Sequence, residues 1–144
     1  MIKGEFCYPY PRPAVTVDIL LITNISSENE ILLIERNSEP FKGMWALPGG
    51  FVDENEDLLD AAIRELIEET GIQNVALTQF GAFGKPGRDP RGHTVSIVYI
   101  TQLPSKINAI AGDDAAKIKW FSVDKLPELA FDHRDIIDLV VSSL

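Results

Sequence analysis

The sequence predicts a domain with both strands and helices, the elements of an α/β fold, because it contains runs of β-branched and aliphatic residues typical of strands and two stretches with the periodicity of amphipathic helices. With 144 residues, the chain has the length of one domain with a proper core, and we expect residues 1–144 to form a single domain. The net charge of −9 argues against a general nucleic-acid binder and a membrane-surface protein, since both need basic patches to meet phosphate. We therefore expect neither nucleic acid nor a membrane among its partners.

Five stretches are predicted to be strands. The first, residues 14–22, has the β-branched composition of a strand that is buried on both faces. A polar turn connects it to the second, residues 30–35, and the two pair naturally as a hairpin. The other three are expected over residues 75–83, 94–101 and 117–121.

The segment before the first strand, residues 6–13, is rich in proline and aromatic residues, so it should be extended and unable to form a helix. Aromatic residues in this position are expected to cover a sheet edge. The alternative is that Tyr8 or Tyr10 stacks on a base, across a dimer interface, while Arg12 meets phosphate. Cys7 is the single cysteine of the chain, which excludes an intrachain disulfide.

A helix is predicted from Asp57, with Asn55 as a plausible N-cap and Gly71 just past its C-terminal end. At roughly 100° per residue, one face of this helix is apolar and the opposite face carries clustered carboxylates. The face predicted to pack on the core comprises Leu59, Ala62, Ile63, Leu66 and Thr70. The acidic face comprises Glu65, Glu68 and Glu69.

The three glutamates repel one another, at a cost of about a few tenths of a kcal/mol per pair, so a cation should offset this repulsion. Hard divalent cations such as Mg²⁺ take oxygen ligands and usually share them between one or two carboxylates and the phosphates of a substrate. The turn Leu47-Pro48-Gly49-Gly50 before the helix brings bare backbone close enough for a carbonyl oxygen to join these ligands. The pattern therefore predicts a site for Mg²⁺ and a phosphorylated ligand.

The spacing of this region resembles the Nudix box. Gly50 is followed after five residues by Glu56 and after seven more by Arg64-Glu65-Leu66, and Glu68-Glu69 and Gly71-Ile72 complete the pattern. Every defined position of the box is matched. The resemblance implies a Nudix-type α/β/α sandwich with a mixed central sheet, in which the box helix and the C-terminal helix lie on opposite sides.

The resemblance also implies roles for the residues of the box. The expected ligands of two or more Mg²⁺ ions, with Mn²⁺ as the alternative metal, are the Gly49 carbonyl oxygen and the carboxylates of Glu68 and Glu69. Glu65 is either a further ligand or the general base. Glu56 and Arg64 are expected to pair and to support the metal-binding glutamates from behind, because such partners fix the orientation of metal ligands.

Residues 84–93 form a predicted loop of fixed shape, with two prolines and three glycines in ten residues. The loop carries Lys85, Arg88 and Arg91 against Asp89 alone, and a stiff basic loop next to an acidic metal-binding helix suits a diphosphate. Its end, with the sequence DPRGH, is similar to the corresponding loop of prokaryotic ADP-ribose pyrophosphatases. The alternative is a solvated hairpin loop with incidental charges.

Four further residues, Arg36, Asp113, Asp114 and His93, are candidates for the site. Arg36, at the end of the second strand, is expected to face it. The resemblance implies a downstream acid, either a metal ligand or the catalytic base, and Asp113 and Asp114 are the candidates; an Asx turn is the alternative. His93 and His133 are both predicted to be structural, with His93 favoured as the ligand contact.

The C-terminal part is predicted to contain a short turn of helix over residues 122–129 and a helix from His133 capped by Asp132. The apolar stripe of this last helix comprises Ile136, Ile137, Val140, Val141 and Leu144. No apolar run approaches the roughly 20 residues of a membrane-spanning helix, and the first residues lack the apolar run of a signal peptide. We therefore expect a cytoplasmic protein.

The resemblance to the Nudix box implies Mg²⁺-dependent hydrolysis of a nucleoside diphosphate linked to another moiety, by direct attack of water on phosphorus. The expected substrate is ADP-ribose, which would give AMP and ribose 5-phosphate. Two alternatives stay open: sanitation of nucleoside triphosphates with an oxidised base, and a sensor that binds ADP-ribose-like molecules to regulate transcription. We expect an enzyme, because the box is complete and because the sequence up to Leu144 has no DNA-binding appendage. Homodimerisation is expected from the family resemblance alone.

Overall fold

The computed structural model of the protein describes residues 4–24, 27–112 and 115–144. The strands in these ranges are β1 (Ala14–Thr23), β2 (Glu30–Arg36), β3 (Trp45–Ala46), β4 (Gly49–Phe51), β5 (Thr78–Phe83), β6 (Thr94–Leu103) and β7 (Ala115–Ser122). The helices are α1 (Leu58–Thr70) and α2 (His133–Ser142). The predicted α/β class is confirmed, and each of the five predicted strands is present, although β5 begins three residues later than expected.

The strands form one mixed sheet in the order β3-β2-β1-β6-β5, with β4 also paired to β1 and β7 also paired to β2. β1 and β6 are parallel along their whole lengths, from Ala14 opposite Thr94 to Thr23 opposite Leu103. The predicted hairpin between β1 and β2 is present, but the two strands pair only next to the turn. Beyond that point, β1 pairs with β4 and β2 pairs with β3, while the other edge of β2 pairs with β7 along its whole length.

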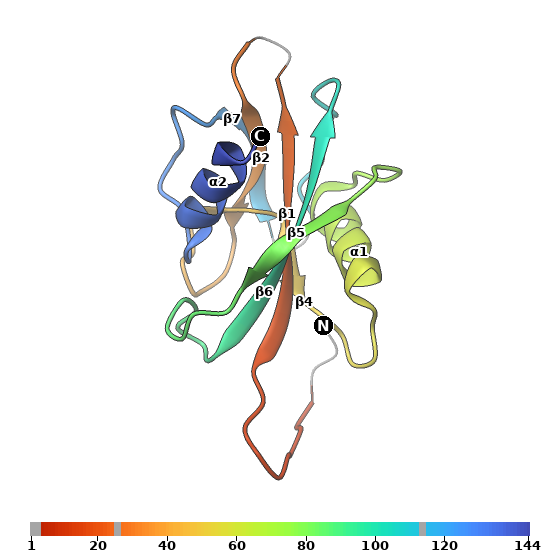
Figure 1. The fold of residues 1–144 in the computed structure, drawn as a ribbon, viewed down its shortest axis with the longest axis vertical. Coiled ribbons are helices and arrows are strands. Elements are labelled where there is room, and N and C mark those ends of the chain that lie inside the picture. The colour runs from red at the N-terminus through yellow and green to blue at the C-terminus, as the bar shows by residue number, and fades with distance from the viewer. Residues whose placement is uncertain (1–3, 25–26, 113–114) are drawn as a thin grey trace.

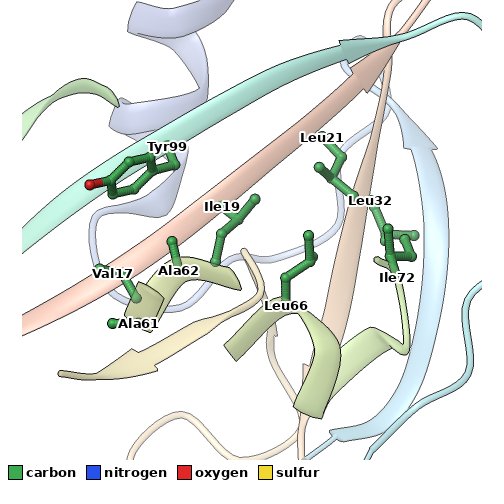
Figure 2. Close-up of a cluster of buried hydrophobic side chains, with 9 residues drawn as sticks. All are labelled: Val17, Ile19, Leu21, Leu32, Ala61, Ala62, Leu66, Ile72 and Tyr99. Atoms are coloured by element: carbon green, nitrogen blue, oxygen red, sulfur yellow. The ribbon is translucent and has the colours of Figure 1, made fainter. Parts of the chain in front are cut away.

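The two helices lie on opposite sides of the sheet (Figure 1), so the predicted α/β/α sandwich is confirmed. Successive residues of a strand point to opposite faces, and β1 is apolar at both sets of positions. The cluster on the α1 side joins Val17, Ile19 and Leu21 of β1 to Ala61, Ala62 and Leu66 of α1 (Figure 2). The cluster on the α2 side joins Leu20 and Ile22 of β1 to Ile136, Ile137 and Val140 of α2.

The boundaries of α1 differ from the prediction at the N-terminal end. Asp57, rather than Asn55, is the N-cap, and its carboxylate accepts a hydrogen bond of 3.2 Å from the Leu59 N–H. Asn55 has a φ of 58° in the turn before the helix, a left-handed conformation that asparagine tolerates. Gly71 ends the helix as predicted, with a φ of 73° and its N–H bonded to the Ile67 carbonyl.

The buried face of α1 is rotated from the predicted one. Leu59 and Ile63, which we expected in the core, are 40% and 41% exposed. Glu65 and Glu69 are buried instead, and each is 7% exposed. The reason is that α1 packs against both β1 and β4, and the small residues at the start of β4 leave room for carboxylates between the helix and the strand.

The C-terminal region also departs from the prediction in detail. Residues 122–129 contain turns but no helix. α2 begins at His133 as predicted, yet the Asp132 side chain does not cap it, because both carboxylate oxygens bind Arg88. Leu144 is 51% exposed and lies past the apolar stripe. In the described part of the chain, no helix combines the length and apolar character needed to cross a membrane.

Candidate active site

A cavity of about 310 Å³ is lined by residues from β1, β2, β4, α1, the loop of residues 84–93 and the start of α2. Its acidic lining residues are Asp18, Glu65, Glu69 and Asp89. Its basic lining residues are Arg36, Arg88 and Arg91, and His133 lies beside them. Carboxylates of the box and cations of the loop thus share one space, as the sequence suggested.

Two glycines bring the backbone of β4 against the carboxylates of α1. The Gly49 N–H donates a hydrogen bond of 3.1 Å to Glu69 Oε2. A Cβ atom at Gly50 would lie 2.5 Å from Glu65 Oε1, and one at Gly49 would lie 2.1 Å from the Val17 carbonyl oxygen. Only glycine fits this approach without displacing either the carboxylate or the neighbouring strand.

Arg64 holds the acidic side of the site together. Its Nε donates to Glu56 Oε2 at 2.7 Å, its Nη1 donates to Glu65 at 2.9 Å and Glu68 at 3.1 Å, and its Nη2 donates to the Phe51 carbonyl at 3.0 Å. The hydrogen bonds from Arg64 lower the pKa of Glu56 to about 2. The pairing of Glu56 with Arg64 that the sequence predicted is therefore present, and it links the turn before α1 to the glutamates.

Glu65 differs from an ordinary surface carboxylate. Burial raises its pKa above the usual value, although the Arg64 guanidinium acts in the opposite direction. A buried carboxylate with a raised pKa accepts a proton more readily than a solvated one. This property is compatible with both roles considered for Glu65, cation ligand and general base.

The box glutamates fit a hard divalent cation in the chemistry of their donors. Glu65 and Glu69 present carboxylate oxygens to the cavity beside the Gly49 backbone, whereas the Glu68 side chain is 54% exposed and does not line the cavity. The described ranges contain no group of three or more His, Cys, Asp or Glu side chains already arranged to hold a metal ion. Arg64 neutralises Glu65 and Glu68 where a cation would otherwise do so.

The basic loop contributes two of its three predicted cations to the cavity. The Arg88 side chain is 4% exposed and binds Asp132 through two hydrogen bonds of 2.6 and 2.9 Å. Arg91 binds Asp89, and its guanidinium also lies 4.6 Å from the centre of the Phe51 ring. Arg88 and Arg91 are thus held in fixed positions by carboxylates of their own chain, which the sequence did not reveal.

The remaining predicted residues divide into those at the cavity and those away from it. Arg36 lines the cavity and donates a hydrogen bond of 2.7 Å to the Pro40 carbonyl. Lys85 is exposed outside the lining, and Arg12 lies over the Tyr8 ring in the N-terminal arm. The exposed His93 contacts the Gly84 carbonyl, also outside the cavity.

Asp113 and Asp114, the predicted downstream acids, lie outside the described residues.

Sequence reasoning missed three residues. Asp18, 7% exposed on β1, accepts a hydrogen bond from Ser96 of β6, and His133 lies beside it. Of the two histidines, His133 lines the cavity and His93 does not, so the predicted contact of His93 with a ligand has no support from this cavity. One signal was available: an aspartate inside an otherwise apolar, two-sided strand is costly unless it has a specific partner.

This site belongs to a known class. Residues 12–140 match the model of the NUDIX domain family, and the chain belongs to that family.

Three known proteins are similar to this chain. The chain is 46% identical over 128 residues to the ADP-ribose pyrophosphatase of Methanocaldococcus jannaschii, which covers 89% of this chain and 73% of the relative. It is also similar to the NUDIX domain of Shewanella oneidensis NrtR in complex with ADP ribose, with a TM-score of 0.86 and 30% identity. The match covers 93% of this chain and 90% of the NrtR chain.

A bifunctional NMN adenylyltransferase/ADP ribose pyrophosphatase from Francisella tularensis, complexed with AMP and a Mn ion, is the third relative. It has a TM-score of 0.83 and 35% identity over 94% of this chain. The chain spans 43% of the length of that protein.

Proposed function

We propose that this chain is a Nudix pyrophosphohydrolase that cleaves ADP-ribose to AMP and ribose 5-phosphate with Mg²⁺ as the cation. The observation that carries the proposal is the common cavity, in which Glu65 and Glu69 share one space with Arg88 and Arg91. A diphosphate needs a cation on its acidic side and charge-assisted donors on the other. The identity to an ADP-ribose pyrophosphatase and the fold similarity to a domain complexed with ADP ribose support the choice of substrate.

The basic residues bind and orient the diphosphate. Arg91 suits direct contact, because its side chain is 38% exposed and keeps donors beyond those used by Asp89. Arg88 is more buried and adds positive charge from behind. A charge-assisted hydrogen bond from Arg91 to phosphate is worth roughly 1.5 to 3 kcal/mol.

The box residues hold the cation and handle the proton. Glu69 and the Gly49 carbonyl oxygen are the proposed ligands at the cavity, Glu68 is the further ligand that the Nudix box implies although its side chain does not line the cavity, and Mn²⁺ is the alternative metal. When bound, the cation supplies positive charge that offsets the charge on the phosphates and favours deprotonation of the attacking water. Glu65 either adds a ligand or accepts the water proton, and Asp114 is the other candidate base. Arg64 and Glu56 keep the glutamates in position.

The reaction consumes one water molecule. Its oxygen forms a bond to one phosphorus, the bond between that phosphorus and the bridging oxygen breaks, and the second phosphate leaves with the electron pair. The water proton passes to the general base and then to solvent.

A substrate panel tests the proposal. The purified protein with Mg²⁺ is offered ADP-ribose, NADH, diadenosine polyphosphates, UDP- and GDP-sugars and 8-oxo-guanine triphosphates at equal concentration. We expect the highest kcat/KM for ADP-ribose, with AMP and ribose 5-phosphate as products in equal amounts. A panel led by the oxidised triphosphate would refute the substrate and favour the sanitation alternative. Replacing Mg²⁺ by Mn²⁺ in the same assay tests the metal.

The second candidate function is ADP-ribose sensing without hydrolysis. It is favoured by the fold similarity to the NrtR domain, whose solved complex contains ADP ribose. Calorimetric titration of ADP-ribose beside the hydrolysis assay separates the two functions, since a sensor binds the ligand and leaves it intact.

The expected homodimer and the expected cytoplasmic location also stay predictions. Light scattering during size-exclusion chromatography tests the first, and imaging of the tagged protein in its host tests the second.

A further inference from the structure

Asp18 is a buried carboxylate in the wall of the cavity, apart from the carboxylates of the Nudix box. It lies in the middle of β1 and is 7% exposed. Ser96 of the parallel strand β6 donates a hydrogen bond to its Oδ2 atom, and His133 Nε2 lies 3.6 Å from its Oδ1 atom. Three separate elements thus converge on this carboxylate.

His133 presents a hydrogen-bond donor to the same place. Its Nδ1 accepts a hydrogen bond of 3.0 Å from the Leu47 N–H, so Nδ1 has no proton and Nε2 carries one. Burial raises the pKa of Asp18, but His133, Ser96 and the nearby Arg88 outweigh burial and hold this pKa below its usual value. The cavity wall therefore contains a charged acceptor with an N–H donor beside it.

Part of the acceptor capacity of Asp18 is not used by the described residues. Among the described residues, Ser96 is the one donor within hydrogen-bond distance of its carboxylate, and His133 at 3.6 Å is too distant for a full hydrogen bond. A carboxylate has about four acceptor sites, and a buried one is costly when these sites stay empty. Because Asp18 lines the cavity, a bound ligand is placed to supply the missing donors.

The position of Asp18 indicates which part of a substrate it meets. A Cβ atom at Gly49 would lie 2.6 Å from Asp18 Oδ1, and the N–H of the same glycine is bonded to Glu69. Asp18 is therefore close to the place where the box glutamates act on the diphosphate. A phosphate would be repelled by the carboxylate, whereas the sugar next to the diphosphate carries neutral hydroxyl donors.

We propose that Asp18 is a specificity-determining residue that binds the vicinal hydroxyls of a ribose of the substrate, with Ser96 and His133 as its positioning residues. A hydroxyl donates to Asp18 Oδ1, and the oxygen of the diol accepts from His133 Nε2–H. This inference rests on the proposed function. ADP-ribose contains two riboses with the same diol, one in adenosine and one at the terminus, and the experiment distinguishes them.

The experiment measures whether the effect of removing a substrate hydroxyl depends on Asp18. The probes are ADP-ribose, its analogue without the 2-hydroxyl of the adenosine ribose, and its analogue without the 2-hydroxyl of the terminal ribose. Both kcat/KM and calorimetric Kd are measured for the wild type, Asp18→Asn and the control Thr16→Val. Thr16 lines the same cavity from the same face of β1, so its variant reports general disturbance of the wall.

For the wild type, loss of the hydroxyl bound by Asp18 should raise Kd and lower kcat/KM by about tenfold or more. In Asp18→Asn, this penalty should fall to about threefold or less, whereas Thr16→Val should keep it at the wild-type value. The analogue that loses its penalty identifies the ribose. If Asp18 only supports the fold, Asp18→Asn will weaken all three probes equally and leave both penalties unchanged, which overturns the inference.

The same data separate this inference from the proposed function. Binding of ADP-ribose without hydrolysis, with a penalty that depends on Asp18, supports the diol site and refutes the enzyme. Hydrolysis of ADP-ribose with penalties independent of Asp18 supports the enzyme and refutes the diol site. The absence of both binding and hydrolysis refutes the enzyme and the diol site together. If Asp18→Asn does not fold, Ser96→Ala keeps the carboxylate but removes its orientation, and it should also reduce the penalty.

Discussion

Replacing Arg64 with alanine is expected to destabilise the protein by an amount that depends on pH. The guanidinium of Arg64 contacts Glu56, Glu65, Glu68 and the Phe51 carbonyl, so its loss leaves three carboxylates without their shared partner. The largest consequence for stability concerns Glu56, whose pKa is lowered from 4.5 to about 2.

The magnitude follows from this change in pKa. One pKa unit corresponds to about 1.4 kcal/mol, so the pairing of Glu56 would contribute about 3 kcal/mol if it were fully shielded from water. The side chains of Arg64 and Glu56 are 22% and 16% exposed, and solvent screens the interaction. We therefore expect Arg64→Ala to lower the free energy of unfolding by about 1 to 2 kcal/mol at pH 7.

The sign of the pH dependence is fixed by the direction of the pKa change. Folding lowers the pKa of Glu56, so its stabilisation is fully present above pH 4.5 and is lost as the pH falls toward 2. The pKa of Glu65, already raised in the folded protein, should rise further without Arg64, which adds destabilisation that also disappears in acid. Urea unfolding of the two proteins should therefore show a gap at pH 7 that narrows steadily below pH 4.5.

Arg134→Ala is the matched control for this series. Arg134 faces Asp138 at 3.5 Å on the surface of α2, where both side chains are more than half exposed, and its loss should change the free energy of unfolding by less than about 0.5 kcal/mol. A gap for Arg64→Ala that stays constant from pH 7 to pH 2.5 would refute the reasoning, because the loss would then come from packing rather than from the ion pairs.

Three further changes test the site. Glu69→Gln should lower kcat by at least about a hundredfold, measured at saturating Mg²⁺, while thermal unfolding stays near the wild-type midpoint; near-normal turnover would contradict the ligand assignment. Gly50→Ala places a Cβ atom 2.5 Å from Glu65 Oε1 and should displace this carboxylate. We expect kcat to fall by about tenfold or more, with KM less affected. A wild-type rate would mean that the position of Glu65 does not matter for catalysis. Arg91→Ala should lower kcat/KM for ADP-ribose by about tenfold, because it removes a charge-assisted contact with phosphate. Lys85 is exposed, and the control Lys85→Ala should retain activity. Equal effects of the two changes would disprove a specific phosphate contact by Arg91.

The local pattern of the sequence was sufficient to predict the elements of the fold. Apolar runs predicted the strands, and the cap at Gly71 and the periodicity of the box predicted α1. The pattern failed for the orientation of that helix, because Glu65 and Glu69 have the polarity of surface residues. Glu65 is buried because Arg64 supplies charge and Gly50 leaves space for its carboxylate, and Glu69 is buried where the Gly49 N–H donates to it. These contacts are not visible in helical periodicity alone.

The candidate site was predictable where its residues are close in sequence and hidden where they are distant. The Glu56–Arg64 pair, 8 residues apart, was predicted from the resemblance to the Nudix box. The pairing of Arg88 with Asp132 spans 44 residues and that of Leu47 with His133 spans 86, so both depend on how the sheet and α2 assemble. An aspartate such as Asp132, placed directly before a helix, looks like an N-cap in the sequence even when its carboxylate binds an arginine instead.

The long parallel ladder between β1 and β6 has a consequence for the folding of the chain. Asp18 and Ser96, which are 78 residues apart, meet only when this ladder has formed. Folding is slowed because the entropy cost of closing a loop of that length comes before the contacts between the two strands can form. Pairing of parallel strands is therefore among the slower steps of folding. During synthesis, the edge of β1 that pairs with β6 therefore stays open after β2 and β4 have been made. Until β6 has left the ribosome, this open edge can pair with another chain and needs protection from aggregation.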